Sequence, residues 1–167
     1  MDGAKSFGKP AGRIRLDERV DPNPAKLVSI NKYGDPVSPG QRLFQLTQEA
    51  LDAFRALRTA ALAAGFNKEL FTLTSAYRSS VRQAQLAAAA RAQYGAGAGK
   101  WVAQTRSEHI TGRAFDLNLG IDNTSSNAKA QLFAHTSAFQ WLRTNAASYG
   151  LNPYYEEPWH WSYNVKP

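Results

Sequence analysis

The sequence lacks cysteine altogether, and this absence limits the chemistry that the chain can perform. Its 167 residues include no cysteine and three histidines. Without thiols there is no disulfide, no thiolate nucleophile, no iron–sulfur cluster and no cysteine-type zinc site. A catalytic metal ion, if the protein uses one, must therefore be held by histidine, aspartate and glutamate side chains.

Long apolar runs are missing as well. No stretch approaches the roughly 20 apolar residues that a membrane-spanning helix needs, so no membrane span is expected. The first residues, Met1 to Val20, are polar and basic and do not contain the apolar core of a secretory signal peptide. We therefore expect no signal peptide in the chain as given. This leaves the localisation open. The protein is either not exported, already stripped of its signal peptide, or exported by another route.

Blocks of like charge are also missing, although the net charge is +7 at pH 7. Nucleic acid, an anionic membrane surface and an acidic polymer such as a cell wall would each attract such a chain. A nucleic-acid footprint is normally clustered or striped, whereas lysine and arginine are scattered along this sequence. The pattern favours a basic solvated surface and no nucleic-acid partner.

The length and composition predict one domain with an N-terminal extension. At roughly 100–200 residues per domain, the 167 residues form a single unit. Residues 1–25 are rich in glycine, proline and charge, and we expect an arm that is either wrapped on the domain or disordered. The domain proper is expected to span residues 26–167 and to begin with a short strand at 26–30.

Apolar periodicity predicts helices and strands in an irregular order. Helical spacing over residues 46–64 is bounded by Thr47 as N-cap and Gly65 as stop. The other expected elements are a strand at 70–77, a helix at 80–94, a strand at 113–119, one or two helices within 128–149, and a last strand within 154–163. Because no regular βαβ rhythm is present, the predicted fold class is α+β, a single domain with several helices packed on a small antiparallel sheet.

Two of the three histidines stand in unusual contexts. His109 precedes a turn at Gly112, after which the predicted strand carries Asp116 on its less apolar face. His160 lies in the predicted last strand, three residues after Glu157. Catalytic zinc usually takes three protein ligands and leaves one position for water, and a nearby carboxylate can accept a proton from that water. The residues alone leave an alternative open, in which the two histidines share no purpose and Asp116 is an edge residue.

Two motifs around these residues resemble a known family. Ser107 to Asp116 matches S-x-H-x-x-G-x-A-x-D, and Glu157 to His160 matches E-P-W-H. Together they resemble the zinc D-Ala-D-Ala carboxypeptidases of the VanY type, which are related to peptidoglycan D,D-dipeptidases and phage L-alanyl-D-glutamate endopeptidases. The resemblance implies one catalytic zinc ion, carried by the small sheet and held by His109, Asp116 and His160.

Three further stretches agree with the family in the same order. Asn31-Lys32 is similar to its N-K element. Ser75 to Ser79, followed by Gln83, is similar to S-G-Y-R-S-x-x-x-Q. Trp141 to Gly150 is similar to W-L-x-x-N-A-x-x-Y-G. The likeness therefore covers roughly Leu27 to Tyr163.

The resemblance implies a role for each matching residue. Glu157 is expected to act as general base, and Arg78 is expected to polarise the scissile carbonyl and stabilise the oxyanion. The residues expected to bind the substrate or line the metal pocket are Tyr77, Gln83, Ser107 and Trp159. From the residues alone, Arg78 could equally form a surface ion pair, and the Ser107 hydroxyl could serve a turn or a helix cap.

The resemblance also implies a function, with the substrate left open. We expect hydrolysis of the terminal D-Ala-D-Ala bond of peptidoglycan stem peptides in the cell wall or periplasm, without an obligate protein partner. Thr105-Arg106 replaces a frequent Pro-Gly pair, Ala76 replaces a glycine, and a glycine–alanine stretch at 94–101 lies where loops shape the substrate cleft. One alternative is an L-alanyl-D-glutamate-type endopeptidase acting as a phage lysin or secreted antibacterial effector. Another is a non-catalytic cell-wall-binding module.

Overall fold

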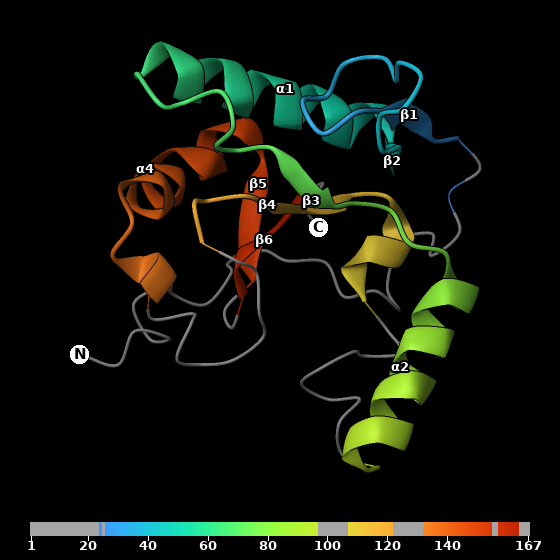
Figure 1. Cartoon of the computed structure of the whole chain (residues 1–167). Helices are drawn as coiled ribbons and strands as arrows, with labels where there is room; N and C mark the ends of the chain where they lie inside the picture. The colour runs from blue at the N-terminus through green and yellow to red at the C-terminus, as the bar shows by residue number, and fades with distance from the viewer. Residues whose placement is uncertain (1–23, 25, 97–106, 122–131, 155–156, 164–167) are drawn as a thin grey trace.

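The computed structural model describes residue 24 and residues 26–96, 107–121, 132–154 and 157–163 (Figure 1). The elements, in chain order, are β1 (Val28–Ile30), β2 (Phe44–Leu46), α1 (Gln48–Ala63), β3 (Leu73–Ser75), α2 (Ser80–Tyr94), η3 (Glu108–Thr111), β4 (Ala114–Leu117), α4 (Ser137–Asn145), η4 (Ala146–Tyr149), β5 (Leu151–Tyr154) and β6 (Glu157–Tyr163), where η denotes a 3-10 helix. Among these residues, no helix combines the length and the apolar character that crossing a membrane requires.

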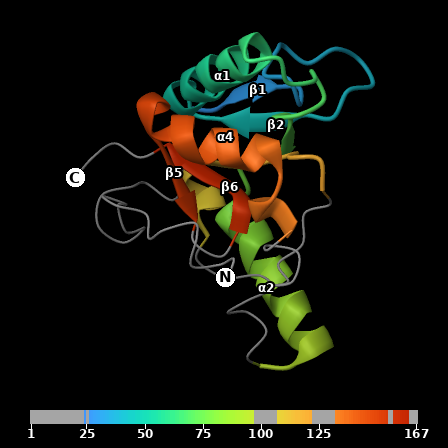
Figure 2. The ribbon, with the colours of Figure 1, turned by 90° about the vertical axis from the view of Figure 1, so that its left-hand side faces the viewer.

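Two antiparallel sheets form the framework. The larger has the strand order β3-β4-β6-β5, and the smaller pairs β1 with β2. Helices α1 and α4 lie beside the larger sheet, and α2 projects away from it (Figure 1, Figure 2). The predicted α+β class, with helices packed on a small antiparallel sheet, is therefore confirmed.

The register of the central strands separates a core face from a polar face. Phe115 on β4 pairs with Trp161 on β6, and both side chains are buried. The next pair along the strands joins Asp116 to His160. Because successive side chains point to opposite faces of a sheet, burying the aromatic pair directs Asp116 and His160 to the other face. On this polar face, Ser75 of β3 lies next to Asp116, because the two residues pair in the sheet.

Helix α1 closes the core over the aromatic face of the sheet. The Thr47 hydroxyl caps its first turn by accepting a hydrogen bond from the amide of Ala50, as the sequence predicts. Its apolar stripe is buried, and the ring of Phe54 packs edge-on against Phe115, with centroids 5.4 Å apart. The helix ends at Ala63, with Ala64 as its C-cap and Gly65 just beyond as the stop that the sequence predicts.

Helix α2 has the predicted bounds but little packing. Ser79 caps it by accepting a hydrogen bond from the amide of Arg82. Its buried residues are Gln83, Ala87 and Ala90. Its alanine-rich sequence is intrinsically a good helix former, which accounts for a helix that projects from the body.

The short strands differ from the predictions. The expected strand at 70–77 is reduced to Leu73–Ser75, and Leu46, which the periodicity assigned to a helix, is the last residue of β2. Strands β2 and β5 were not predicted. A strand of three or four residues has too little alternation to identify it, and its hydrogen bonds come from a partner elsewhere in the chain.

The other predictions are confirmed in outline. The strand expected at 113–119 is β4, and the last strand, within 154–163, is β6. Helix α4 and the turn η4 lie in the expected helical region and end at Gly150 with φ +74°. Apart from Pro24, the arm predicted at 1–25 lies outside the described residues, as do residues 97–101 of the glycine–alanine stretch and most of the loop at 120–127.

Gly112 is the position where the fold depends most directly on a glycine. It has φ +68°, and a Cβ there would lie 2.7 Å from Leu27 Cδ2 and 3.2 Å from Thr47 Cγ2. Gly65 provides the matched control, because its φ is +97° and no atom lies within 4 Å of a Cβ built there. We expect Gly65→Ala to cost about 1–2 kcal/mol of unfolding free energy through backbone strain alone.

Gly112→Ala should cost about 1–3 kcal/mol more than Gly65→Ala, because overpacking adds to the strain. Urea unfolding of the two variants and the wild type measures the difference. Equal stability of the two variants would show that the crowding around Gly112 is relieved without cost.

Candidate metal centre

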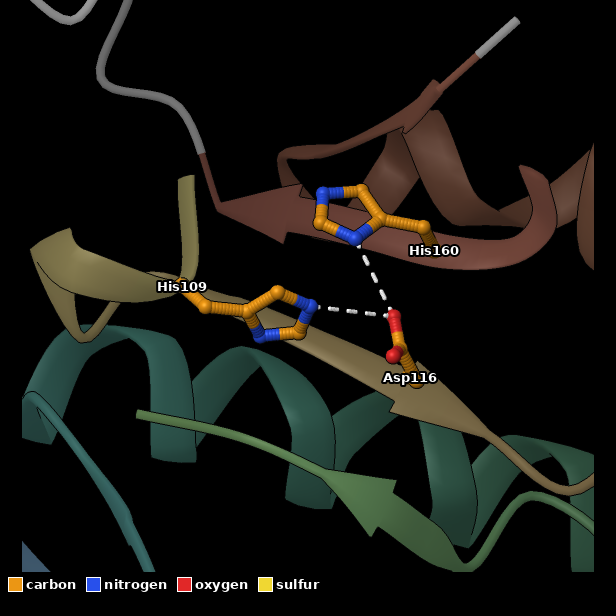
Figure 3. Close-up of side chains that lie close together, drawn as sticks. All are labelled: His109, Asp116 and His160. Carbon is orange, nitrogen blue, oxygen red and sulfur yellow. Dashed lines mark hydrogen bonds and ion pairs between the residues drawn. The ribbon is translucent and has the colours of Figure 1, made fainter. Parts of the chain in front are cut away.

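The three predicted ligands meet on the polar face of the sheet. His109 comes from η3, Asp116 from β4 and His160 from β6, and Figure 3 shows a nitrogen of each imidazole ring directed at the same oxygen of the Asp116 carboxylate. The Oδ1 atom of Asp116 lies 3.3 Å from His109 Nε2 and 3.0 Å from His160 Nδ1. One possible ligand atom from each residue lies within 4.8 Å of the others. Both histidines are 4% exposed.

A short turn brings His109 beside Asp116. Ser107 begins the turn, and its hydroxyl accepts a hydrogen bond from the His109 amide. Gly112 ends it in the left-handed conformation, which a glycine adopts without strain. The Gly112 carbonyl then accepts a hydrogen bond from the Thr47 amide, which ties the turn to the start of α1.

Each imidazole has a hydrogen-bond acceptor on its far side. His109 Nδ1 lies 2.8 Å from the carbonyl of Ala76, and His160 Nε2 lies 3.0 Å from the Glu108 carboxylate. Since carbonyls and carboxylates only accept, these nitrogens carry protons and donate. The opposite nitrogens, Nε2 of His109 and Nδ1 of His160, are the ones directed at Asp116. The hydrogen bonds therefore select which nitrogen of each ring serves the centre.

The buried charges interact strongly. Burial alone would raise the pKa of Asp116, but His109 and His160 outweigh it and hold that pKa well below its usual range. Burial alone would lower the pKa of His160, but hydrogen bonds to Asp116 and Glu108 raise it to about 10. The electrostatics thus favour a carboxylate at Asp116 and positive charge beside it.

This donor set fits a zinc ion. Two imidazole nitrogens and one carboxylate oxygen are ligands that catalytic zinc sites use, with a fourth position left open. Zinc bonds of about 2.0 Å place neighbouring tetrahedral ligand atoms about 3.3 Å apart, close to the separations of 3.0 and 3.3 Å from Asp116 Oδ1. The prediction of one zinc ion therefore agrees with the chemistry of the three side chains and with the distances of the two histidine nitrogens from Asp116 Oδ1.

Glu157 lies at the border of this centre. Its Oε2 atom is 3.8 Å from His160 Nδ1, the nitrogen directed at Asp116, and its side chain is 30% exposed. Burial raises the pKa of Glu157 against the opposing charge of His160, and Asp116 adds to the rise. A carboxylate with a raised pKa at the edge of a metal centre is suited to accept a proton from water.

Arg78 is held beside the same centre by three contacts. Its backbone amide donates to the carbonyl of His109, and its guanidinium donates to Gln83 Oε1 at 2.8 Å and to Ser75 Oγ at 3.0 Å. Burial lowers the pKa of Arg78, while the charges of Asp116 and Glu157 oppose that shift. Arg78 is therefore a positioned cation of the metal centre rather than a surface ion pair.

For the residues expected to bind substrate, the structure gives contacts within the protein. Gln83 is buried and contacts Arg78, and Ser107 caps η3. The Tyr77 amide donates to the carbonyl of Gln45. Their contacts with a substrate remain predictions.

Trp159 has a different setting from the one expected. Its ring packs in the hydrophobic core, with its centroid 5.1 Å from that of Phe133. It lies two residues from Trp161 and therefore on the core face of β6, opposite to His160. The predicted wall of the metal pocket is instead a core residue in the structure, and its part in binding stays a prediction.

Two of the five motifs belong to the framework. The Asn31 carboxamide accepts hydrogen bonds from the amides of Tyr33 and Asp35, which closes a turn. Trp141 packs edge-on against Phe71, with centroids 5.5 Å apart. These contacts support the fold.

Sequence reasoning missed two contributors to the centre, Glu108 and the Ala76 carbonyl. Glu108 stands beside His109 in the motif, and this neighbouring acidic residue was the available signal. Its partner, however, is His160, 52 residues away along the chain. The Ala76 contact involves a backbone atom, for which the residue type gives no signal.

Two buried histidines and an aspartate, with a glutamate and an arginine beside them, are the groups that a metal-dependent hydrolase needs. Comparison with known proteins agrees. The family profile described as VanY: D-alanyl-D-alanine carboxypeptidase matches residues 43–166. The chain belongs to this family of peptidases, as the sequence motifs predict. The search of curated proteins found no match to the sequence.

Solved structures show the same fold. The chain is similar to the LdcB LD-carboxypeptidase, with 27% identity and a TM-score of 0.67 over 86% of this chain and 70% of that one. It is similar to the vancomycin resistance D,D-pentapeptidase VanY, solved with Zn(II), with 20% identity and a TM-score of 0.52 over 90% and 82% of the two chains. VanYB in complex with D-alanine-D-alanine gives 20% identity and a TM-score of 0.54 over 92% and 82%. At 20% identity, the likeness supports the fold alone.

Replacing a histidine that binds zinc should reduce the zinc content, whereas replacing a histidine outside the metal centre should not. We expect His109→Ala to lose its zinc after dialysis, because only two ligands remain, while His135→Ala keeps it. His135 is the third histidine and is exposed on the described surface. Metal analysis of both purified variants provides the measurement. Full zinc occupancy in His109→Ala would contradict the ligand set.

Proposed function

We propose that this protein is a zinc-dependent D,D-carboxypeptidase that removes the terminal D-Ala from peptidoglycan stem peptides. The observation that carries the proposal is the matched family together with a complete centre, in which Glu157 and Arg78 border the three ligands. Peptidoglycan stem peptides are the proposed partners, and the proposed place of action is the cell wall or periplasm, where such peptides occur.

Glu157 supplies the proton transfer in this proposal. A zinc ion in such a site lowers the pKa of bound water toward ~7 and polarises a carbonyl oxygen. The Glu157 carboxylate takes the proton from the attacking water and later delivers it to the leaving amine. Its position 3.8 Å from a ligand nitrogen places it within reach of the space beside the three ligands. Its raised pKa makes the carboxylate a stronger base for taking the proton from water.

Arg78 supplies a fixed positive charge. As the amide carbonyl is attacked, negative charge develops on its oxygen, and a positioned cation stabilises that charge in the transition state. Gln83 and Ser75 hold the guanidinium by one hydrogen bond each. Because these contacts orient Arg78 before substrate binds, little reorganisation is needed during the reaction.

A second candidate is removal of D-Ala from an L-residue. LdcB is an LD-carboxypeptidase and shares 27% identity with this chain, against 20% for VanYB with D-alanine-D-alanine. The L-alanyl-D-glutamate-type endopeptidase is kept as an alternative, because residues 97–101 of the stretch expected to shape the cleft lie outside the described part of the chain. A non-catalytic wall-binding module is disfavoured, because the ligand, base and arginine positions are all filled.

Replacing the base should separate catalysis from metal binding. In Glu157→Gln we expect kcat to fall by about 10²–10⁴, with the zinc content unchanged, since Glu157 is not one of the three ligands. Hydrolysis of a peptide ending in D-Ala-D-Ala, measured beside metal content, tests both parts. Wild-type kcat in Glu157→Gln would contradict the assignment of the base.

The bond that is cleaved should be visible in the products. We expect stem peptides ending in D-Ala-D-Ala to lose one D-Ala, as detected by mass spectrometry of purified muropeptides. Amidation of the terminal carboxylate should abolish this cleavage, because a carboxypeptidase must recognise that group. Release of D-Ala only from stems in which it follows an L-residue would favour the second candidate. Splitting within the stem, unaffected by amidation, would identify an endopeptidase.

A further inference from the structure

The His160 ring lies between carboxylates on two sides. Its Nδ1 atom is directed at Asp116, and its Nε2 atom lies 3.0 Å from Glu108 Oε2. The side chains of His160 and Glu108 are 6% and 18% exposed. A hydrogen bond to a charged acceptor that is largely removed from water is both stronger and more directional than one at the surface.

Glu108 does not belong to the ligand set. The group of possible ligands among the described residues consists of His109, Asp116 and His160. The two nitrogens of an imidazole point away from each other, so a carboxylate on Nε2 lies behind the ring and cannot share a metal with Nδ1. The same geometry lets Glu108 act on the metal only through His160.

Sequence position alone does not explain this contact. Glu108 lies in η3 and His160 in β6, and the two elements meet through β4. The turn that places His109 beside Asp116 therefore also directs its neighbour to the second ligand histidine. One short segment, Ser107–Gly112, orients both imidazoles, directly for His109 and through a side chain for His160.

We infer that Glu108 is a positioning residue, which fixes the tautomer and orientation of His160 for zinc and strengthens His160 as a ligand. The inference rests on the proposed function, because it concerns the same metal centre. A carboxylate that accepts the distal N–H of a ligand histidine holds the proton away from the metal-binding nitrogen and makes that nitrogen a better donor.

Glu157 provides an internal comparison. Both glutamates lie near the His160 ring, Glu108 at Nε2 and Glu157 3.8 Å from Nδ1. If position relative to the ring decides the role, the same substitution at the two sites has different consequences. Glu157→Gln should lose hydrolysis and keep its zinc affinity, whereas Glu108→Gln should bind zinc more weakly than the wild type.

The experiment measures the zinc dissociation constant by competition with a chromophoric chelator. We expect Glu108→Ala to bind zinc about 10–100-fold more weakly than the wild type. Glu108→Gln should fall between them, because its amide oxygen still accepts but carries no charge. Glu49→Gln is the matched surface control, since Glu49 has a 59% exposed side chain and pairs with Arg113. It should bind zinc as the wild type does.

A spectroscopic readout distinguishes positioning from a general loss of stability. In the Co(II)-substituted protein, the visible absorption should change in Glu108→Gln and not in Glu49→Gln, because a reoriented His160 alters the ligand geometry. Near-UV circular dichroism of the metal-free variants checks that the fold is intact. If Glu108→Ala does not fold, Glu108→Gln decides the outcome.

The results separate this inference from the proposed function. Wild-type zinc affinity and cobalt spectra in the folded Glu108 variants, with zinc lost from His109→Ala, would overturn the role of Glu108 and leave the metal centre standing. Retention of zinc by His109→Ala would instead contradict the metal centre, and the inference with it.

Discussion

The antiparallel register of β4 and β6 is the constraint on which the rest of the structure depends. It places Asp116 opposite His160 and, one residue away, Phe115 opposite Trp161. A slip of one residue would turn the aromatic pair toward the polar face and bury the charged pair in the core. The free energy of burying the aromatic residues therefore helps to set the geometry of the metal centre. The pairing of β4 with β6 therefore forms part of the hydrophobic core on one face of the sheet and part of the metal centre on the other.

A buried cluster of charges is stable only when each member has partners, and here the partners also organise the chemistry. The Ala76 carbonyl and the Glu108 carboxylate hold the two imidazoles from behind. Arg78 is fixed by Gln83 and by its own backbone contact to His109. Groups that would be costly to bury alone thus form a connected network, in which the contacts that satisfy the polar groups also orient them.

The extent to which the sequence predicts the fold depends on the element. Helix α1 was predicted because its apolar periodicity, Thr47 cap and terminal glycine are all local signals. Helix α2 was predicted with the right bounds because its alanine-rich sequence has no breaker before Gly95. Strands β2 and β5 were not predicted, because segments of three and four residues show too little alternation, and they are defined by pairing with β1 and β6. The same reasoning explains why β3 is shorter than the apolar run around it.

For the metal centre, the sequence by itself determined the residue types: with no cysteine, the motifs left two histidines, one aspartate, a glutamate and an arginine as the reactive groups. Only the tertiary structure decided how they are used. It showed which nitrogen of each imidazole is directed at Asp116, that Glu108 contacts His160, and that Trp159 packs in the core with Phe133. The physical reason is that a residue's chemistry is carried by its side chain, whereas orientation and partners arise from contacts between strands and turns far apart in the chain.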